Sequence, residues 1–335
     1  MSDRTVTVRV FCSAKGGVGK STLAVAAAKL LAKQGHAVAL IDADLTGTSL
    51  ADGLDLCAPR VALDSEGRMD FTTADGAWLS RPESDTARNA RRVQKNRADS
   101  ELAPPPPYLT DLLVLPLEED RSVPLERLCW HMKDDGVRYF PSSPLAHDIG
   151  LALGWFAAGE ELAWIQRVAW FMDVLLERLP ALDEIVFDVP PGLFGFGLEL
   201  MKLLSHLGKM QQLHGMPPTY PPWGRRSITW VCDPVLVTSQ DRNDLWTSLD
   251  WFVENRSQLP QLRMLANRHT KPVPVLRQLI RERLEGLKLP TVEIPLQGVG
   301  LVQGTLGRIF SEDHDLRLND EVLSLAPAIL GGSVK

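Results

Sequence analysis

The residues best suited to chemistry lie close to the N-terminus, in a stretch that combines three glycines, two lysines and two hydroxyl side chains. The stretch reads Ala14-Lys15-Gly16-Gly17-Val18-Gly19-Lys20-Ser21-Thr22. Glycines at this density let backbone N–H groups converge on an anion, and the N-terminus of a following helix adds partial positive charge. Lys20 can reach the terminal phosphates of a nucleotide, and the Ser21 hydroxyl can bind Mg²⁺. The stretch therefore predicts a loop that binds a phosphate chain.

Two aspartates, Asp42 and Asp44, follow the next apolar segment of the chain, residues 36–41. Paired carboxylates suit a magnesium-assisted phosphate site, because one can hold the water shell of the metal and the other can orient or deprotonate the attacking water. Active sites of open parallel sheets lie at the carboxyl ends of strands. The pair is therefore a candidate for this chemistry.

A third carboxylate, Asp188, ends another apolar segment and is followed by Val189-Pro190-Pro191-Gly192. An aspartate in this place can hold Mg²⁺ through water. Gly192 has no side chain, so its backbone N–H can approach a terminal phosphate. Asn267 and Arg268 follow a further strand end, and the amide of Asn267 can both donate and accept hydrogen bonds.

A parallel sheet would bring these strand ends together. Apolar periodicity predicts strands at 5–13, 36–41, 112–116, 137–141, 184–189, 227–232, 263–266 and 291–294. It predicts helices at 21–34, 160–178, 198–207, 241–255, 275–285 and, in the tail, 321–330. Strands that alternate with helices of this length predict an α/β fold, with a predominantly parallel twisted sheet of about seven to eight strands and helices on both faces.

The composition is that of an ordinary globular protein, and we expect one domain over residues 1–335. Hydrophobic residues make up 44% and charged residues 23% of the chain. The net charge of −6 argues against a surface built for broad nucleic-acid binding. The chain shows no signal core and no apolar run of about 18 residues, so we expect no transmembrane segment. Residues 60–107 are predicted to be a partly flexible insertion rich in proline and arginine, and residues 208–226 an irregular segment.

The four cysteines, Cys12, Cys57, Cys129 and Cys232, form no C-x-x-C pair. None of them stands at metal-ligand spacing from a histidine. The pattern is typical of a reduced, cytoplasmic protein without a disulfide framework.

The glycine-rich stretch resembles the deviant Walker A signature of the MinD/ParA family of P-loop ATPases. The common pattern starts with Gly seven residues before the final Ser or Thr, whereas Ala14 stands there in this chain and the additional Lys15 follows it. Asp42-Ala43-Asp44 is similar to switch I of the Mrp-like members of the family, and Asp188 to Gly192 is similar to switch II. The resemblance covers residues 5–50, 109–205 and 227–300, and it implies a P-loop NTPase fold.

The resemblance also implies an activity. A family member would be a Mg²⁺-dependent ATPase that dimerises with ATP between the protomers, and Lys15 would cross the interface toward the partner's γ-phosphate. Asp44 would be the catalytic aspartate, Asp42 an outer-shell magnesium group, and Asn267 would read adenine. The implied catalytic residues are Lys15, Lys20 and Asp44, and the implied magnesium residues are Ser21, Asp42 and Asp188. The implied nucleotide-binding residues are Gly16, Gly17, Val18, Gly19, Lys20, Ser21, Thr22, Gly192, Asn267 and Arg268.

The partner is less well defined by the sequence. We expect a partner protein that is bound in a nucleotide-dependent way. The lack of paired cysteines disfavours iron–sulfur carriers, nitrogenase-like reductases and tail-anchored-protein targeting ATPases. Pro327 interrupts the apolar tail, which disfavours membrane association and favours core packing. The basic run Arg88 to Arg97 is compatible with DNA binding, although a solvated loop explains it as well. Two other functions stay open: a non-hydrolysing nucleotide-bound adaptor, and a small-molecule kinase or synthetase on a related fold.

Overall fold

The computed structural model describes most of the chain. The described residues are 4–47, 50–65, 69–74, 78–79, 106–114, 123–158, 161–193, 195–210, 228–239, 241–259, 261–269, 271–287, 295–300, 313 and 315–331. The basic run Arg88 to Arg97 and residues 211–226 of the irregular segment lie outside them, so the expectations for these segments stay predictions.

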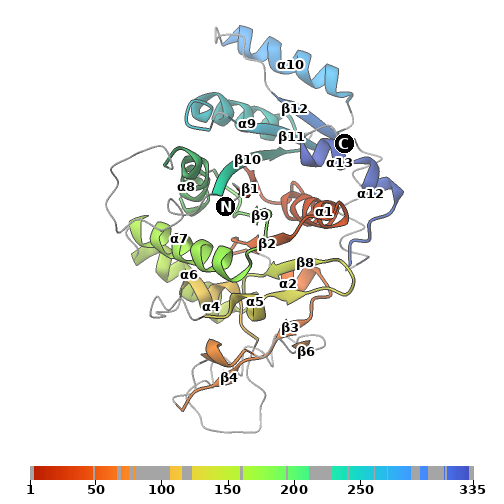
Figure 1. Ribbon diagram of the computed structural model, residues 1–335. Helices are drawn as coiled ribbons and strands as arrows, with labels where there is room; N and C mark the ends of the chain where they lie inside the picture. Colours follow the sequence, from red (N-terminus) through yellow and green to blue (C-terminus); the bar gives the residue numbers. More distant parts are fainter. Residues whose placement is uncertain are drawn as a thin grey trace.

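A sheet of eight strands runs through the centre of the molecule, in the order β12-β11-β10-β1-β9-β2-β8-β7 (Figure 1). Neighbouring strands are parallel, except that β7 and β8 pair antiparallel at one edge. The strands are β1 (Arg4–Ser13), β2 (Val38–Asp42), β7 (Trp130–His131), β8 (Val137–Phe140), β9 (Glu184–Asp188), β10 (Ile228–Thr238), β11 (Arg263–His269) and β12 (Leu296–Gly300). The predicted α/β class, strand number and parallel arrangement are confirmed.

Helices cover both faces of this sheet (Figure 1). They are α1 (Lys20–Lys33), α2 (Leu50–Gly53), α4 (Leu109–Leu113), α5 (Leu125–Leu128), α6 (Ala146–Ala158), α7 (Glu161–Arg178), α8 (Phe196–Met210), α9 (Arg242–Asn255), α10 (Val273–Gly286), α12 (Asp320–Ser324) and α13 (Ala326–Leu330). Residues 58–79 add two small antiparallel pairs, β3 (Ala58–Pro59) with β6 (Trp78–Leu79) and β4 (Ala62–Leu63) with β5 (Met69–Asp70), and the 3-10 turn η1 (Phe71–Thr73).

Alternate residues of the central strand β1 enter two different hydrophobic cores. Val8 and Val10 pack with residues of α7, α8 and α9, whereas Phe11 packs with residues of α1 and α13. This division follows from the geometry of a strand, in which successive side chains point to opposite faces. Residues 10–13 are all buried, so the end of β1 that leads to the glycine-rich loop is packed on both faces.

The prediction of a strand at residues 112–116 is wrong, because α4 occupies residues 109–113. A short apolar run does not distinguish a strand from a buried helix. Asp111 favours the helix over the strand, because its carboxylate accepts a hydrogen bond from the Tyr108 N–H at 2.8 Å and so caps the helix. Leu112 and Leu113 are then buried in the core that contains α7.

Strand ends in the C-terminal half also differ from expectation. β10 continues through Pro234 to Thr238 instead of ending at Cys232. Proline removes one hydrogen bond of the ladder, but Val235, Leu236 and Val237 are fully buried and keep the strand in place. β12 lies at residues 296–300, whereas the predicted last strand, 291–294, lies outside the described residues. The predicted tail helix is divided into α12 and α13, with Pro327 in the first turn of α13.

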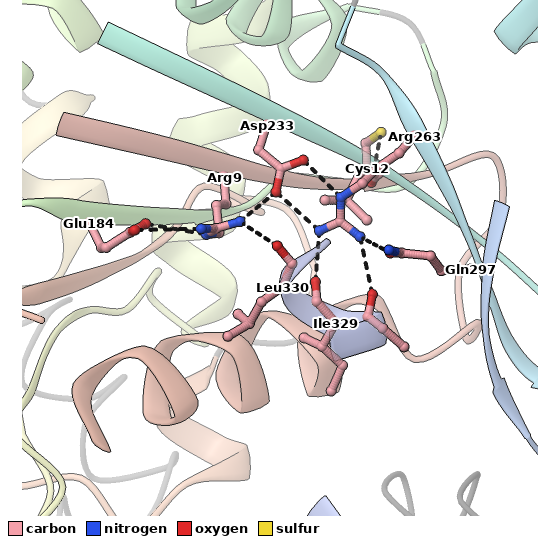
Figure 2. A network of polar contacts seen from close by, with 10 residues as sticks. Arg9, Cys12, Glu184, Asp233, Arg263, Gln297, Ile329 and Leu330 are labelled. Atoms are coloured by element: carbon pink, nitrogen blue, oxygen red, sulfur yellow. Dashed lines mark hydrogen bonds and ion pairs between the residues drawn. The ribbon is translucent and has the colours of Figure 1, made fainter. Parts of the chain in front are cut away.

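Two arginines and their partners link the tail helix α13 to five strands of the sheet (Figure 2). Arg9 of β1 pairs with Glu184 of β9 at 3.2 Å and with Asp233 of β10 at 2.6 Å, and it donates to the Leu330 carbonyl at 2.9 Å. Arg263 of β11 pairs with the other side of Asp233 at 2.8 Å.

Arg263 also donates to the carbonyl groups at the end of α13. Its Nη2 lies 2.7 Å from the Ile329 oxygen, and its Nη1 lies 3.3 Å from the Ala328 oxygen and 2.8 Å from Gln297 Oε1. Cations at a helix C-terminus offset the negative end of the helix dipole. The tail is therefore part of the core of the sheet, as the sequence predicted.

We expect Arg263→Ala to lower the free energy of unfolding by about 3 kcal/mol, since it removes a buried cation that pairs with the half-buried Asp233 and leaves the helix carbonyls without their donor. The Arg263 side chain is 7% exposed. Arg317→Ala is the control, because this side chain is 78% exposed and its ion pairs are long, and it should cost less than about 1 kcal/mol. Urea unfolding of both variants measures the difference; equal losses would contradict the role given to Arg263.

Among the described residues, no helix combines the length and the apolar character needed to cross a membrane.

Candidate functional site

The glycine-rich loop joins the end of β1 to the start of α1. Gly17 and Gly19 have φ angles of +77° and +87°, which L side chains rarely adopt. Gly19 is the N-cap of α1 and offers no side chain to cap it. The first N–H groups of α1 are therefore free of a side-chain cap, and Lys15, Gly16 and Gly17 before them are exposed. This geometry suits an anion.

Lys20 points toward the neighbouring strand and is almost completely buried. Its ammonium group forms an ion pair with the Asp188 carboxylate. Burial alone lowers the pKa of Lys20, but Asp188, with Asp44 and Asp42, raises it above the ordinary value. Lys20 therefore stays charged inside the protein, next to the loop whose phosphates it is predicted to contact.

Asp42 lies directly beside Asp188, because β2 and β9 place these two residues opposite each other in parallel register. The Asp42 side chain is fully buried, and its Oδ2 accepts hydrogen bonds from the Leu50 N–H at 2.9 Å and the Ser142 hydroxyl at 2.8 Å. Burial, and then the nearby Asp188 carboxylate, raise the pKa of Asp42 to about 7. The carboxylates of Asp42 and Asp188 therefore lie side by side in the protein interior.

Asp44 completes this group. Its Oδ1 is buried and accepts no hydrogen bond from the described residues. A Cβ on Gly47 would overlap the carboxylate, so the turn after β2 closes tightly around it. Burial raises the pKa of Asp44, and Lys20 opposes this shift. An oxygen without a partner at such a place needs a ligand or a water.

These observations allow a test of whether Mg²⁺ and a nucleotide fit the site. Three buried carboxylates, Asp42, Asp44 and Asp188, face the single ammonium of Lys20, so a divalent cation would offset the remaining negative charge. Within the described residues, no group of three or more His, Cys, Asp and Glu side chains is arranged to hold a metal ion alone. Mg²⁺ typically takes one or two protein ligands and completes its shell with waters and phosphate oxygens. The residues therefore fit a metal that arrives with a triphosphate.

Ser21 and Thr22 follow Lys20 in the first turn of α1. The Ser21 hydroxyl lies 3.5 Å from the Lys20 ammonium and is partly exposed, whereas Thr22 is buried. Ser21 therefore lies beside Lys20, and its role as a magnesium ligand stays a prediction.

Gly192 contacts the loop in a different way from the one expected. Its N–H donates to the Ser13 carbonyl at 2.9 Å, at the end of β1, and its φ is +91°. Approach of this N–H to a phosphate would require the bond to Ser13 to open. The phosphate contact of Gly192 stays a prediction.

Asn267 lies at the far side of the loop, near the end of β11. Its Nδ2 donates to the Val18 carbonyl at 2.7 Å, and its Oδ1 is buried without a partner among the described residues. The side chain of Arg268 lies outside the description. The predicted contact of both residues with adenine stays a prediction.

The Lys15 side chain lies beside the N-terminus of α9. It is 50% exposed, and its ammonium lies 3.9 Å from Asp241 Oδ1. Sequence reasoning missed Asp241 and also Ser142. Both could have been found, since Ser142 follows the end of a predicted strand and Asp241 stands where a helix N-cap is expected.

A family model described as "ParA: NUBPL iron-transfer P-loop NTPase" matches residues 4–74, which include the loop, Asp42 and Asp44. An iron–sulfur cluster carrier protein of Clostridium perfringens is 48% identical over 60 residues, 17% of this chain and 21% of the relative. A cytosolic Fe-S cluster assembly factor, the Nubp2 homolog of Drosophila ananassae, is 38% identical over 80 residues, 24% and 31% of the two chains. The chain thus spans less than a third of the length of these curated relatives.

Solved structures are similar over nearly the whole chain. The cell division ATPase MinD of Pyrococcus furiosus aligns with 98% of this chain and 99% of its own, with a TM-score of 0.51 and 15% identity. A plasmid partition protein of Borrelia burgdorferi bound to AMPPNP aligns with 98% of both chains, with a TM-score of 0.50 and 17% identity. At this identity the likeness shows the fold, while the match at residues 4–74 adds the signature of the loop. The chain therefore has the fold of these P-loop ATPases, and its residues 4–74 match the ParA/NUBPL family model.

Proposed function

We propose that this protein is a slow Mg²⁺-dependent ATPase that works as a molecular switch. With ATP held between two protomers it forms a homodimer, and hydrolysis to ADP and phosphate returns it to the monomer. The observation that carries the proposal is the convergence of Lys20, Asp42, Asp44 and Asp188 on the loop before α1. The solved plasmid partition protein bound to AMPPNP supports the choice of nucleotide.

Each residue of the site has a chemical role in this proposal. The loop N–H groups and Lys20 bind the phosphates, and Lys20 offsets charge that develops on the transferred phosphoryl group. Ser21 and Asp188 would hold Mg²⁺, with Asp42 behind them; the ion, when bound, would neutralise charge on the phosphate oxygens. Asp44 has a free acceptor oxygen and would orient the attacking water. Lys20 must exchange its contact with Asp188 for the phosphates when nucleotide enters.

Equilibrium binding and phosphate release, each with Mg²⁺ and with excess chelator, test this activity. We expect ATP binding in both conditions, tighter with the metal, and turnover only with Mg²⁺. Absence of ATP binding in either condition would contradict the proposal.

Lys15 is proposed to act across the dimer. Among the described residues, its ammonium pairs with an exposed carboxylate, that of Asp241, at 3.9 Å. Such a surface ion pair is worth about 1 kcal/mol or less, so breaking it costs little. Lys15→Ala should therefore keep ATP affinity but lose dimer formation and hydrolysis. Sedimentation in the presence of ATP measures the first loss, and phosphate release measures the second.

Asp241→Asn provides the matched control for Lys15→Ala. It removes the carboxylate that Lys15 contacts, while asparagine still suits the N-cap of α9. Dimer formation should be unchanged or stronger. Dimer formation by Lys15→Ala at the level of wild type would show that Lys15 has no role across the interface.

The similar curated proteins are named for iron–sulfur clusters, but the proposal does not extend to cluster binding. Cluster irons are held by cysteine thiolates, and Cys12, Cys129 and Cys232 are buried here, with Cys57 partly exposed. Burial raises the pKa of both Cys12 and Cys129 to about 12, which disfavours the thiolate. We propose instead a partner protein as the target of the switch, and a cytoplasmic location.

A further inference from the structure

Asn267 makes a contact that its predicted role in adenine recognition does not explain. It lies on β11, 249 residues along the chain from Val18, and its side chain donates to the Val18 carbonyl within the glycine-rich loop at 2.7 Å. Asn267 is 3% exposed and Val18 is 5% exposed. The hydrogen bond is therefore shielded from water, where an unmade bond costs more than it does at the surface.

The amide also fills the space beside the next residue of the loop. A Cβ on Gly19 would overlap Asn267 Nδ2. Gly19 has a φ of +87° and begins α1, so its conformation aims the first N–H groups of the helix. The Asn267 side chain thus touches both residues that precede Lys20.

The donor and acceptor chemistry defines which group of Asn267 makes the contact. A backbone carbonyl can only accept, so the amide nitrogen must face Val18, and Oδ1 is left buried without a partner among the described residues. Among the described residues, the hydrogen bond that orients the amide is the one to the Val18 carbonyl in the loop.

We propose that Asn267 is a positioning residue that holds the glycine-rich loop in its phosphate-binding conformation, by fastening Val18 and supporting Gly19. The inference rests on the proposed nucleotide-binding function and adds a residue that acts on the phosphates through the loop. It predicts that loss of Asn267 weakens binding of any phosphate chain, whatever base is attached.

Calorimetry of Asn267→Ala with three Mg²⁺-bound probes tests this inference: ATP, inosine triphosphate and inorganic tripolyphosphate. Inosine carries an oxygen in place of the adenine amino group, and tripolyphosphate carries no base. We expect the affinity for all three probes to fall by a similar factor, about tenfold, the size expected for one buried hydrogen bond. In the nucleotide-free protein, hydrogen exchange of amides 16–20 should become faster.

Asn255→Ala is the matched control. Asn255 also donates from Nδ2 to a backbone carbonyl, that of Trp251 at 2.9 Å, but at the far end of α9. This variant should leave the affinities and the loop exchange unchanged. Asn267→Ser repeats the test with a smaller cavity, and thermal melting of each variant verifies that it is folded.

The outcomes separate the inference from the function on which it rests. A loss confined to ATP would assign Asn267 to adenine recognition and overturn the positioning role, and so would unchanged affinity for all three probes. Failure of the wild-type protein to bind ATP would overturn the proposed function itself.

Discussion

Replacing Lys20 with alanine is expected to lower ATP turnover at least about a hundredfold, the size seen when a group that stabilises transition-state charge is removed. Lys20 is 6% exposed, and its charge is maintained by the carboxylates around it. Without the ammonium group, a triphosphate would meet Asp42, Asp44 and Asp188 with no cation from α1 between them. ATP affinity should therefore fall as well. Phosphate release and equilibrium binding of ATP measure the two effects.

Lys33→Ala is the control for this variant. Lys33 belongs to the same helix, but it lies exposed in the last turn, at the opposite end from the loop. The same change of charge and side-chain length there should leave turnover and affinity unchanged. Turnover by Lys20→Ala at the wild-type rate would show that the site around Lys20 is not the catalytic centre.

The second large effect is expected at Asp44. Asp44→Ala should lower the rate of hydrolysis by about 10²- to 10⁴-fold, the range for loss of a general base, and should keep ATP bound. The reason is that Asp44 has a buried oxygen without a partner, whereas Asp42 is already held by Leu50 and Ser142 and Asp188 by Lys20. Single-turnover phosphate release, with ATP affinity measured in parallel, tests the separation of binding from chemistry.

Asp55→Asn is the control for this separation, since Asp55 lies exposed after α2 in the same part of the chain. It should behave as the wild type in both assays. If Asp44→Ala changed neither hydrolysis nor the lifetime of the dimer, the protein would be better described as an adaptor that holds ATP without using it.

The sequence predicted the parts of the site that are local. Glycine spacing predicted the loop, and apolar segments that end in Asp42 and Asp188 predicted the two strands beside it. The parallel register that places these two aspartates opposite each other follows from such strands, because their carboxyl ends share one edge of the sheet. Local patterns of this kind depend on backbone preference and periodicity, which a single sequence contains.

Contacts between residues that are far apart in the chain could not be predicted from the sequence. The pairing of Lys20 with Asp188 and the contact of Asn267 with Val18 depend on which strands become neighbours. The link between Arg263 and the end of α13 is of the same kind. The prediction of a strand at residues 112–116 was wrong for another reason. A short apolar run has no period that distinguishes a strand from a helix, and here the cap at Asp111 favours the helix.

The central claim is that ATP controls assembly of two protomers, and the mass of the ATP-bound protein tests it most directly. Light scattering of Asp44→Ala should give twice the monomer mass with Mg²⁺ and ATP, because nucleotide is held but not hydrolysed, and the monomer mass with Mg²⁺ and ADP. The same monomer mass with both nucleotides, at concentrations where binding of each is saturated, would contradict the account.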